Sequence, residues 1–408
     1  MRVAVIGGGA AGLTAAGFAA KLGADVDLYE KNDRCGVKLR ITGKGRCNLT
    51  NNCTREEFFD NVVSNPKFLY SAHSAFDPQA VMAFFESLGV PLKTERGRRV
   101  FPVSDKASDI AEALICFCRD NGVKTIRKNV KKIIKDGTFS VICSDRAEKY
   151  DKVIICTGGL SYPKTGSTGD GYAFAKSFGH TVIQPCPSLV PLICSDKLCP
   201  ECEGLSLKNV TLTVTDTANG KTVYKEQGEM LFTGNGVSGP LVLSASAHMK
   251  DVKPGKYALH IDLKPALDEK TLDSRILSDF SENINKNFSN SLSALLPSKL
   301  IAPFVERTGI DPYKKVNAVT AAERKTVVRT LKDLSLGVSS YAPLSEAVIT
   351  RGGVCTKEIY PKTMQSKLIP GLYFAGEVID VDAYTGGYNL QIAFCTAYAA
   401  ANGLYSEK

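Results

Sequence analysis

The chain has 408 residues, of which 44% are hydrophobic and 23% charged, and its 51 basic and 42 acidic residues give a net charge of +9. This composition is that of a folded chain and excludes an intrinsically disordered one, and the length predicts two or three domains. The moderate positive charge favours a solvated surface over a nucleic-acid interface, so nucleic acid is not the expected partner.

The cysteines and the apolar segments indicate where the protein works. Thirteen cysteines are scattered along the chain, several of them in apolar segments such as those of Cys118 and Cys156. That usage is typical of a reducing cytoplasm and not of a disulfide framework. The apolar start imitates a signal peptide, but its four glycines and the strand-like residues after it contradict that reading. No other stretch is long enough to cross a bilayer, so we expect a cytoplasmic protein without membrane insertion.

The chain opens with a strand, a glycine-rich turn, a helix and a second strand. An apolar run at 3–6 leads into GGGAAG, and the second strand ends on Glu30. Gly7 permits the tight turn, Gly9 lets the backbone approach a pyrophosphate, and Gly12 lets the helix pack against the strand. Glu30 is placed to accept a hydrogen bond from a ribose 2′-hydroxyl. The pattern predicts a dinucleotide site for FAD or NAD rather than NADP.

The segment after Val123 favours FAD over NAD. Short alternating strands are predicted at 124–134 and 139–144, and a strand from Val153 ends in Thr-Gly-Gly at 157–159. An antiparallel meander here is not the second βαβ half of an NAD domain. FAD-binding domains of the glutathione-reductase type are built this way.

The tail repeats the features of a nucleotide site. A short strand at 371–377 ends in Glu377, and Gly386-Gly387 precedes a helix predicted at 388–401. In a flavoprotein, Glu377 would bind the ribityl or phosphate region, and the helix N-terminus would point at the flavin N1–C2=O edge. Because that edge gains negative charge on reduction, the helix would raise the reduction potential. We expect the tail to complete the cofactor site.

Six motifs together resemble one bacterial family of NAD(P)/FAD-dependent oxidoreductases, which includes aminoacetone oxidase and the flavin reductase assigned to bile-acid dehydroxylation. The resemblance covers nearly the whole chain and implies non-covalent FAD, a two-part Rossmann-like FAD domain, and an inserted β-barrel-like domain with a helical insertion. The motifs are GGGAAG (7–12), ITGKGRCNLTN (41–51), TGGLSYPKTGSTGDGY (157–172), GEMLFTGNGVSGP (228–240), VITRGGV (348–354) and GLYFAGEVIDVDAYTGGYNLQ (371–391).

The hydrophobic periodicity of the middle of the chain fits this α/β fold class with an insertion. It is strand-like over 188–265, helical over 268–335, and strand-like again at 337–341 and 347–350. The predicted domains are an FAD-binding domain at 1–187 and 351–408, a β-barrel-like domain at 188–267 and 336–350, and a helical subdomain at 268–335.

Twenty residues are predicted to bind the cofactor. Those that the resemblance implies are Glu30, Lys38, Arg46, Cys47, Asn48, Val130, Thr157, Gly158, Glu377, Gly387, Asn389 and Leu390. Those that the motifs themselves add are Gly7, Gly9, Ala11, Gly12, Thr42, Gly43, Gly376 and Tyr388. Lys38 and Arg46 are expected to neutralise the pyrophosphate.

No metal site is predicted. Cys199-Pro-Glu-Cys202 is a CxxC motif, but it lacks the second close pair of a zinc site, and we expect a surface loop there. The spacing of the four histidines gives no hydrolase triad, and the catalytic residues stay unknown. By motif position, Tyr162 and Lys164 are polar candidates together with two tail tyrosines, Tyr384 and Tyr388.

The sequence predicts an FAD-dependent oxidoreductase acting on a small molecule. The favoured reaction is NAD(P)H-driven hydride transfer through FAD to an unsaturated carbonyl compound, such as a steroid-like enone. Because there is no second Gly-rich βαβ unit, NAD(P)H is expected only as a transient co-substrate. Two alternatives stay open: an O2-dependent oxidase of a small amine such as an aminoketone, and an RNA-associated flavoprotein. The sequence does not predict the oligomeric state.

Overall fold

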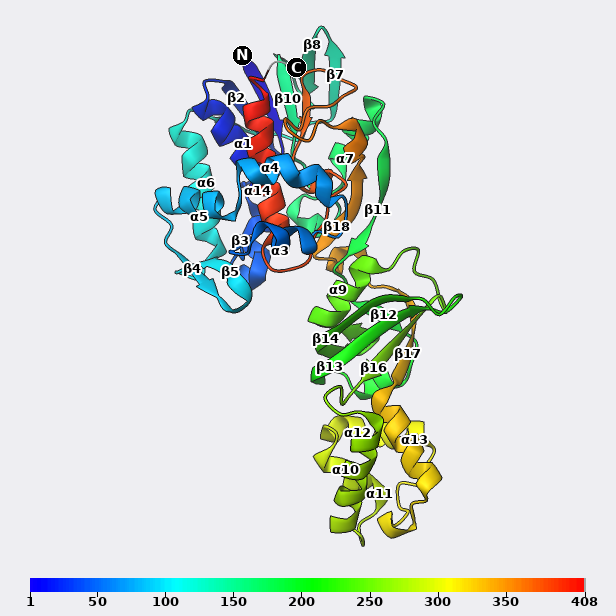
Figure 1. Ribbon diagram of the computed structural model, residues 1–408. Helices are drawn as coiled ribbons and strands as arrows, with labels where there is room; N and C mark the ends of the chain where they lie inside the picture. The colour runs from blue at the N-terminus through cyan, green and yellow to red at the C-terminus, as the bar shows by residue number, and fades with distance from the viewer. Residues whose placement is uncertain (407–408) are drawn as a thin grey trace. The chain divides into compact units, whose positions relative to one another are not determined.

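The computed structural model describes residues 1–406 and forms two compact units (Figure 1). The first unit combines Met1–Ser188 with Leu344–Lys408, and the second unit is Leu189–Pro343. The first unit is therefore built from both ends of the chain. The sequence places the second boundary after residue 350, but β18 (Ile349–Val354) pairs with β11 (Val182–Ser188) and so lies in the first unit.

The first unit is organised around a five-stranded parallel sheet with the order β19-β10-β1-β2-β6. Its strands are β1 (Arg2–Ile6), β2 (Asp25–Glu30), β6 (Lys124–Arg127), β10 (Lys152–Ile155) and β19 (Leu372–Phe374). Strands β1, β10 and β19 are nearly continuous apolar runs, as expected of strands covered on both faces; Val153, Ile154 and Ile155 are all fully buried. Helix α1 (Ala10–Lys21) joins β1 to β2 and packs against α14 (Tyr388–Gly403), the last helix of the chain.

The predicted meander is confirmed, but the prediction of a single strand over 124–134 is wrong. The chain forms β6 and then β7 (Lys132–Asp136), separated by residues 128–131. β6 pairs in parallel with β2, whereas β7 begins an antiparallel sheet with β8 (Thr138–Ile142) and β9 (Ala147–Tyr150). The two strands belong to different sheets, so the chain must break between them. The segment contains no glycine or proline, so nothing in its sequence marks that break.

The remaining elements of the first unit surround the sheet. A small antiparallel sheet has the order β3-β5-β4. These elements are α2 (Val37–Ile41), β3 (Thr50–Asn51), α3 (Arg55–Asp60), α4 (Tyr70–Ala75), α5 (Pro78–Ser87), β4 (Leu92–Glu95), β5 (Arg99–Pro102), α6 (Ala107–Asp120) and α7 (Asp170–Ser177). No helix formed by residues 1–406 is long and apolar enough to cross a membrane.

The second unit contains a closed antiparallel barrel with the order β12-β15-β14-β13-β16-β17, which confirms the predicted insertion. Its strands are β12 (Leu192–Cys194), β13 (Ser206–Asp216), β14 (Thr222–Thr233), β15 (Gly236–Ser238), β16 (Tyr257–Asp262) and β17 (Leu334–Tyr341). The barrel closes where β12 pairs with β17, so no strand edge is left open. This unit has its own hydrophobic core, to which Phe232 and Leu259 contribute.

The helices of the second unit only partly match the sequence prediction. Helical structure over 268–335 is confirmed by α10 (Glu269–Glu282), α11 (Phe288–Ser291), α12 (Ser298–Thr308) and α13 (Ala321–Lys332). The strand-like reading of 188–265 is wrong at α8 (Leu198–Glu201) and α9 (Pro240–His248). Proline at the first position of α9 favours a helix start, and buried apolar residues such as Leu241 and Val242 imitate a strand pattern.

Candidate cofactor-binding site

A cavity of about 860 Å³ opens within the first unit. It is lined by the glycine loop after β1, by residues 41–48, by residues 156–170 and by residues 375–393. This volume is in the range of ligand pockets, roughly 300–1,000 Å³. Segments from the two ends of the chain thus meet at one cavity, as the sequence predicts.

The three glycines of the first loop have different surroundings. Gly7 has a φ of +104°, and a Cβ there would lie 2.5 Å from the Cys156 carbonyl oxygen. A Cβ at Gly12 would lie 1.7 Å from the Gly7 carbonyl oxygen, so only glycine lets α1 approach the turn this closely. A Cβ at Gly9 would meet nothing within 4 Å, because it would project into open space. Gly9 also caps α1 without a side-chain hydrogen bond, which leaves N–H groups of the first turn available to an anion.

Glu30 stands at the end of β2 with its carboxylate held in place. Its Oε2 accepts a hydrogen bond from the Gly8 amide at 2.8 Å, and its Oε1 accepts one from the Asn32 amide at 2.8 Å. The side chain is buried yet lines the cavity. The predicted contact with a ribose hydroxyl stays a prediction.

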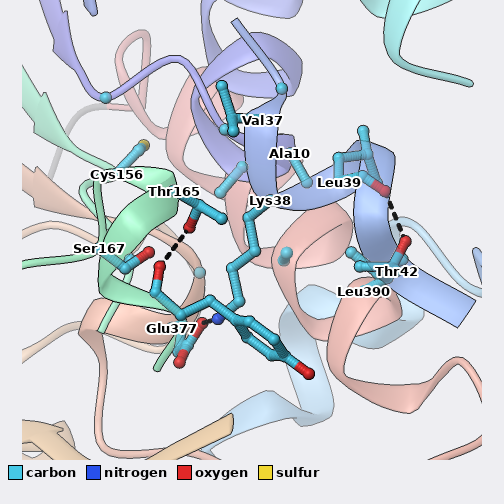
Figure 2. Close-up of a pocket in the computed structure, with 18 of the residues that line it drawn as sticks. Ala10, Val37, Lys38, Leu39, Thr42, Cys156, Thr165, Ser167, Glu377 and Leu390 are labelled. Atoms are coloured by element: carbon cyan, nitrogen blue, oxygen red, sulfur yellow. Dashed lines mark hydrogen bonds and ion pairs between the residues drawn. The ribbon is translucent and has the colours of Figure 1, made fainter. Parts of the chain in front are cut away.

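Lys38 belongs to a hydrogen-bond network on the cavity wall. Its Nζ donates to Glu377 Oε2 and to Ser161 Oγ, each at 2.6 Å, and the Ser161 hydroxyl donates to Glu377 Oε1 at 2.9 Å. Figure 2 shows Lys38 reaching Glu377 across the pocket. Thr350 supports the network, because its amide donates to Glu377 Oε1 and its hydroxyl accepts from the Ser161 amide. Ser161 and Thr350 were not among the predicted site residues, although both lie inside the quoted motifs.

Arg46 is also paired within the protein. Its guanidinium bonds Glu95 and Asp105, each at 2.5 Å, and lies 4.3 Å from the centroid of the Phe101 ring. The hydrogen bond with Arg46 lowers the pKa of Glu95, and hydrogen bonds with Lys93 and then Arg46 lower the pKa of Asp105. Because the charges of Lys38 and Arg46 are already balanced, both side chains fix the wall of the cavity. Neutralisation of a pyrophosphate by them stays a prediction.

The N-terminus of α14 meets the same cavity. Gly387 has a φ of +99°, and a Cβ there would lie 2.3 Å from the Thr50 carbonyl oxygen, so this position requires glycine. Asn389 holds the preceding loop, because its Oδ1 accepts from the Ala383 amide at 2.9 Å and its Nδ2 donates to the Ala383 carbonyl at 2.7 Å. The helix has no side-chain cap, so its first N–H groups are available to a ligand.

Two buried polar atoms of the cavity wall lack a partner among residues 1–406. They are Oδ1 of Asn48 and Oγ1 of Thr157. An acceptor and a hydroxyl left unpaired in this way cost about 1–3 kcal/mol each unless a ligand or water bonds them. With the open space before Gly9 and the uncapped starts of α1 and α14, these atoms fit an extended ligand that carries an anionic centre and polar groups, as FAD does.

All but three of the predicted cofactor residues line this cavity. Gly12 lies behind the wall at the contact between α1 and the glycine turn. Cys47 is fully buried and Tyr388 nearly so, and burial raises the pKa of each to about 12. Direct contact of these three residues with a cofactor stays a prediction. Among the polar candidates, Tyr162 and Tyr384 line the cavity, whereas Lys164 and Tyr388 do not.

The prediction that the CxxC motif lies in a surface loop is wrong. Cys199 lies on the short helix α8, which follows β12, and Cys202 is the C-cap of that helix; both are fully buried. They pack in the core of the second unit, and a hydrogen bond between Cys194 and Cys199 raises the pKa of the Cys194 thiol. Within residues 1–406, no group of three or more His, Cys, Asp or Glu side chains is placed to hold a metal ion.

The glycine turn on a parallel sheet, the antiparallel meander and the returning C-terminal helix define the class of FAD-dependent oxidoreductases. The chain belongs to the HI0933-like protein family, whose Rossmann-domain model matches residues 1–403. It is therefore a flavoprotein oxidoreductase of that family, as the resemblance of the motifs implies.

Two relatives match nearly the whole chain. A 3-dehydro-bile acid delta(4,6)-reductase of Clostridium scindens is 31% identical over 410 residues, which cover 98% of this chain and 98% of the relative. A ribosomal RNA dihydrouridine synthase of Escherichia coli is 30% identical over 406 residues, covering 99% of this chain and 98% of the relative.

Among solved structures, the chain resembles 3-ketosteroid delta1-dehydrogenase of Sterolibacterium denitrificans with a TM-score of 0.50 and 13% identity, covering 98% of each chain. At this identity the likeness shows the fold alone.

Proposed function

We propose that this protein is an FAD-dependent reductase that saturates a carbon–carbon double bond conjugated to a carbonyl group. The observation that carries the proposal is the chemistry shared by its two relatives. A delta(4,6) double bond beside a 3-oxo group and the uracil ring of uridine both contain a C=C bond conjugated to a carbonyl. Because the substrates of the two relatives differ so much, they support a shared reaction, the reduction of a conjugated C=C bond, rather than a shared substrate.

The cavity wall offers what such a reaction needs from the chain. Bound FAD supplies the hydride, and the protein must supply a proton to the neighbouring carbon and exclude water. Two tyrosine hydroxyls, of Tyr162 and Tyr384, belong to the lining. Tyr162 has a φ of +53°, which is costly for a non-glycine residue and typical of functional sites. We therefore assign the proton donor to this pair, with Tyr162 first.

The charge at the cavity favours an anionic acceptor. Lys44 and Arg99 line the cavity and are exposed, and neither has a carboxylate partner among the described residues. An acidic steroid and an RNA phosphate would both gain from this charge. This observation makes a uridine in RNA the second candidate acceptor, although the sequence alone favours a solvated surface.

NAD(P)H is proposed as the electron donor, bound only transiently. The described chain has one glycine-rich βα turn of the dinucleotide type, and the inserted unit is a barrel with helices instead of a second nucleotide domain. The donor must then reach the cavity and leave before the acceptor enters, which predicts ping-pong kinetics. All thirteen cysteines are free thiols, which supports a reducing, cytoplasmic setting.

Anaerobic stopped-flow spectroscopy of the flavin absorbance tests the proposal. NADH or NADPH should bleach the flavin, and a 3-oxo-4,6-diene bile acid or uridine-containing ribosomal RNA should then restore the colour. Mass spectrometry should show two added hydrogens in the acceptor that reacts. Bleaching by an aminoketone, together with no response to either nicotinamide, would contradict the proposal and support an amine oxidase.

A further inference from the structure

A second pocket, of about 380 Å³, lies in the first unit beside the large cavity. The two share only Glu30 and Asn32, so the end of β2 forms the wall between them. Three arginines line the second pocket: Arg34 after β2, Arg40 on α2 and Arg127 at the end of β6. Three separate elements thus bring guanidinium groups to one hollow.

The carboxylates of this pocket are already engaged. Glu30 accepts hydrogen bonds from backbone amides and from Asn32, and Glu112 accepts one from Arg40 at 2.7 Å. Neither Arg34 nor Arg127 has a carboxylate partner among residues 1–406, and both are exposed. The pocket therefore carries surplus positive charge with unused hydrogen-bond donors.

Two further groups show that the inside of the pocket suits an anion. The Nε of Arg40 is buried and has no hydrogen-bond partner within the described chain. The neighbouring thiol of Cys35 is buried, and burial raises its pKa to about 11, so it adds no negative charge at neutral pH. Arginine forks match the geometry of phosphate oxygens, and such charged hydrogen bonds are stronger than neutral ones.

We propose that this arginine pocket binds a phosphate group, separately from the cofactor cavity. Its volume accommodates a phosphate together with part of a nucleoside. The phosphate can come from a free mononucleotide or from the backbone of an RNA chain, and the recognising chemistry is the same in both. The proposal does not depend on which acceptor the flavin reduces.

The test measures binding to the flavin-loaded protein, in which FAD occupies the cofactor site of the large cavity, and the comparison of variants isolates the contribution of the second pocket. The probes are inorganic phosphate, AMP and a fluorescent 12-nucleotide single-stranded RNA, followed by calorimetry or anisotropy. The test variant is Arg34→Gln with Arg127→Gln. The matched control is Arg329→Gln with Lys325→Gln, which removes two exposed charges from α13 of the second unit.

We expect the test variant to bind the recognised probe about ten-fold or more weakly than the wild type, with unchanged flavin content, and the control to bind normally. If the test variant loses affinity only for phosphate and AMP, the ligand is a free phosphate compound. Loss confined to RNA, with a salt slope reduced by about 0.7 for each contact removed, identifies a phosphodiester chain. Equal affinity of the test and control variants for all three probes overturns the proposal. Because only binding is measured, a failure of the reductase assignment leaves this result unaffected.

Discussion

Two glycines of one short loop should respond in opposite ways to substitution. Gly9 has a φ of −81° and a ψ of −167°, which any residue adopts, and a Cβ there meets nothing within 4 Å. Gly9→Val should therefore cost the flavin-free protein at most about 1 kcal/mol, because valine only replaces glycine at the N-cap of α1. Its side chain would enter the cavity before the first turn of α1, so FAD should be lost.

Gly12→Ala should instead damage the fold. Its Cβ would lie 1.7 Å from the Gly7 carbonyl oxygen and 2.9 Å from the Gly7 carbonyl carbon, and backbone atoms cannot rotate away. Such overpacking costs about 3 kcal/mol at the upper end of its usual range. Alanine regains about 1 kcal/mol from its better helix propensity. We expect a net loss of about 2 kcal/mol.

The assay compares two quantities for each variant: FAD released per protein chain, and the thermal unfolding of the stripped protein by circular dichroism. Gly9→Val should be colourless and melt close to the wild type, and Gly12→Ala should melt several degrees lower. A Gly9→Val protein that keeps one FAD per chain would refute the assignment of the cavity. A Gly12→Ala protein as stable as the wild type would refute the packing argument.

Four more predictions follow from single features. Lys38→Met removes the charged partner of the largely buried Glu377 and should cost about 2 kcal/mol in urea unfolding; an unchanged midpoint would contradict the network. Burial lowers the pKa of His73 from 6.5 to about 4, so its stability contribution is present above pH 6.5 and lost as the pH falls toward 4. The free energy of unfolding should fall by about 3 kcal/mol over this pH range because of His73. His73→Phe should abolish this part of the acid sensitivity in unfolding titrations. Asn389→Ala removes both side-chain hydrogen bonds to the backbone of Ala383 and should weaken FAD retention about ten-fold in dilution experiments. Equal retention would show that the loop before α14 does not need these hydrogen bonds. Elemental analysis of tag-free protein should find no stoichiometric zinc; one zinc per chain would overturn the metal-free prediction.

The parts of the fold that follow local rules were predictable from the sequence. Glycine spacing, the helix of small residues and the acid at the end of β2 lie within the first 30 residues, so a short pattern specifies them. The tail was predictable for the same reason, since Gly386 and Gly387 directly precede α14. Each pattern describes neighbours along the chain.

Contacts between distant residues were not predictable in this way. Ser161 and Thr350 meet Glu377 and Lys38 only because the chain ends fold into one unit. The buried state of the α8 cysteines depends on the barrel core, which no spacing rule reveals. The break between β6 and β7 was also not predictable, because it depends on the pairing of β6 with the distant strand β2.

The division of the first unit between the two ends of the chain has a consequence for synthesis on the ribosome. Strand β19 and helix α14 emerge after the whole of the barrel, yet β19 pairs with β10 and α14 packs against α1. The barrel of Leu189–Pro343 is complete well before them and can fold during translation. The nascent first unit must therefore wait with its sheet edge unpaired until residues 372–403 have emerged, and flavin loading can only follow the synthesis of these residues. A chain interrupted before residue 372 would carry a folded barrel beside a first unit that lacks β19 and α14.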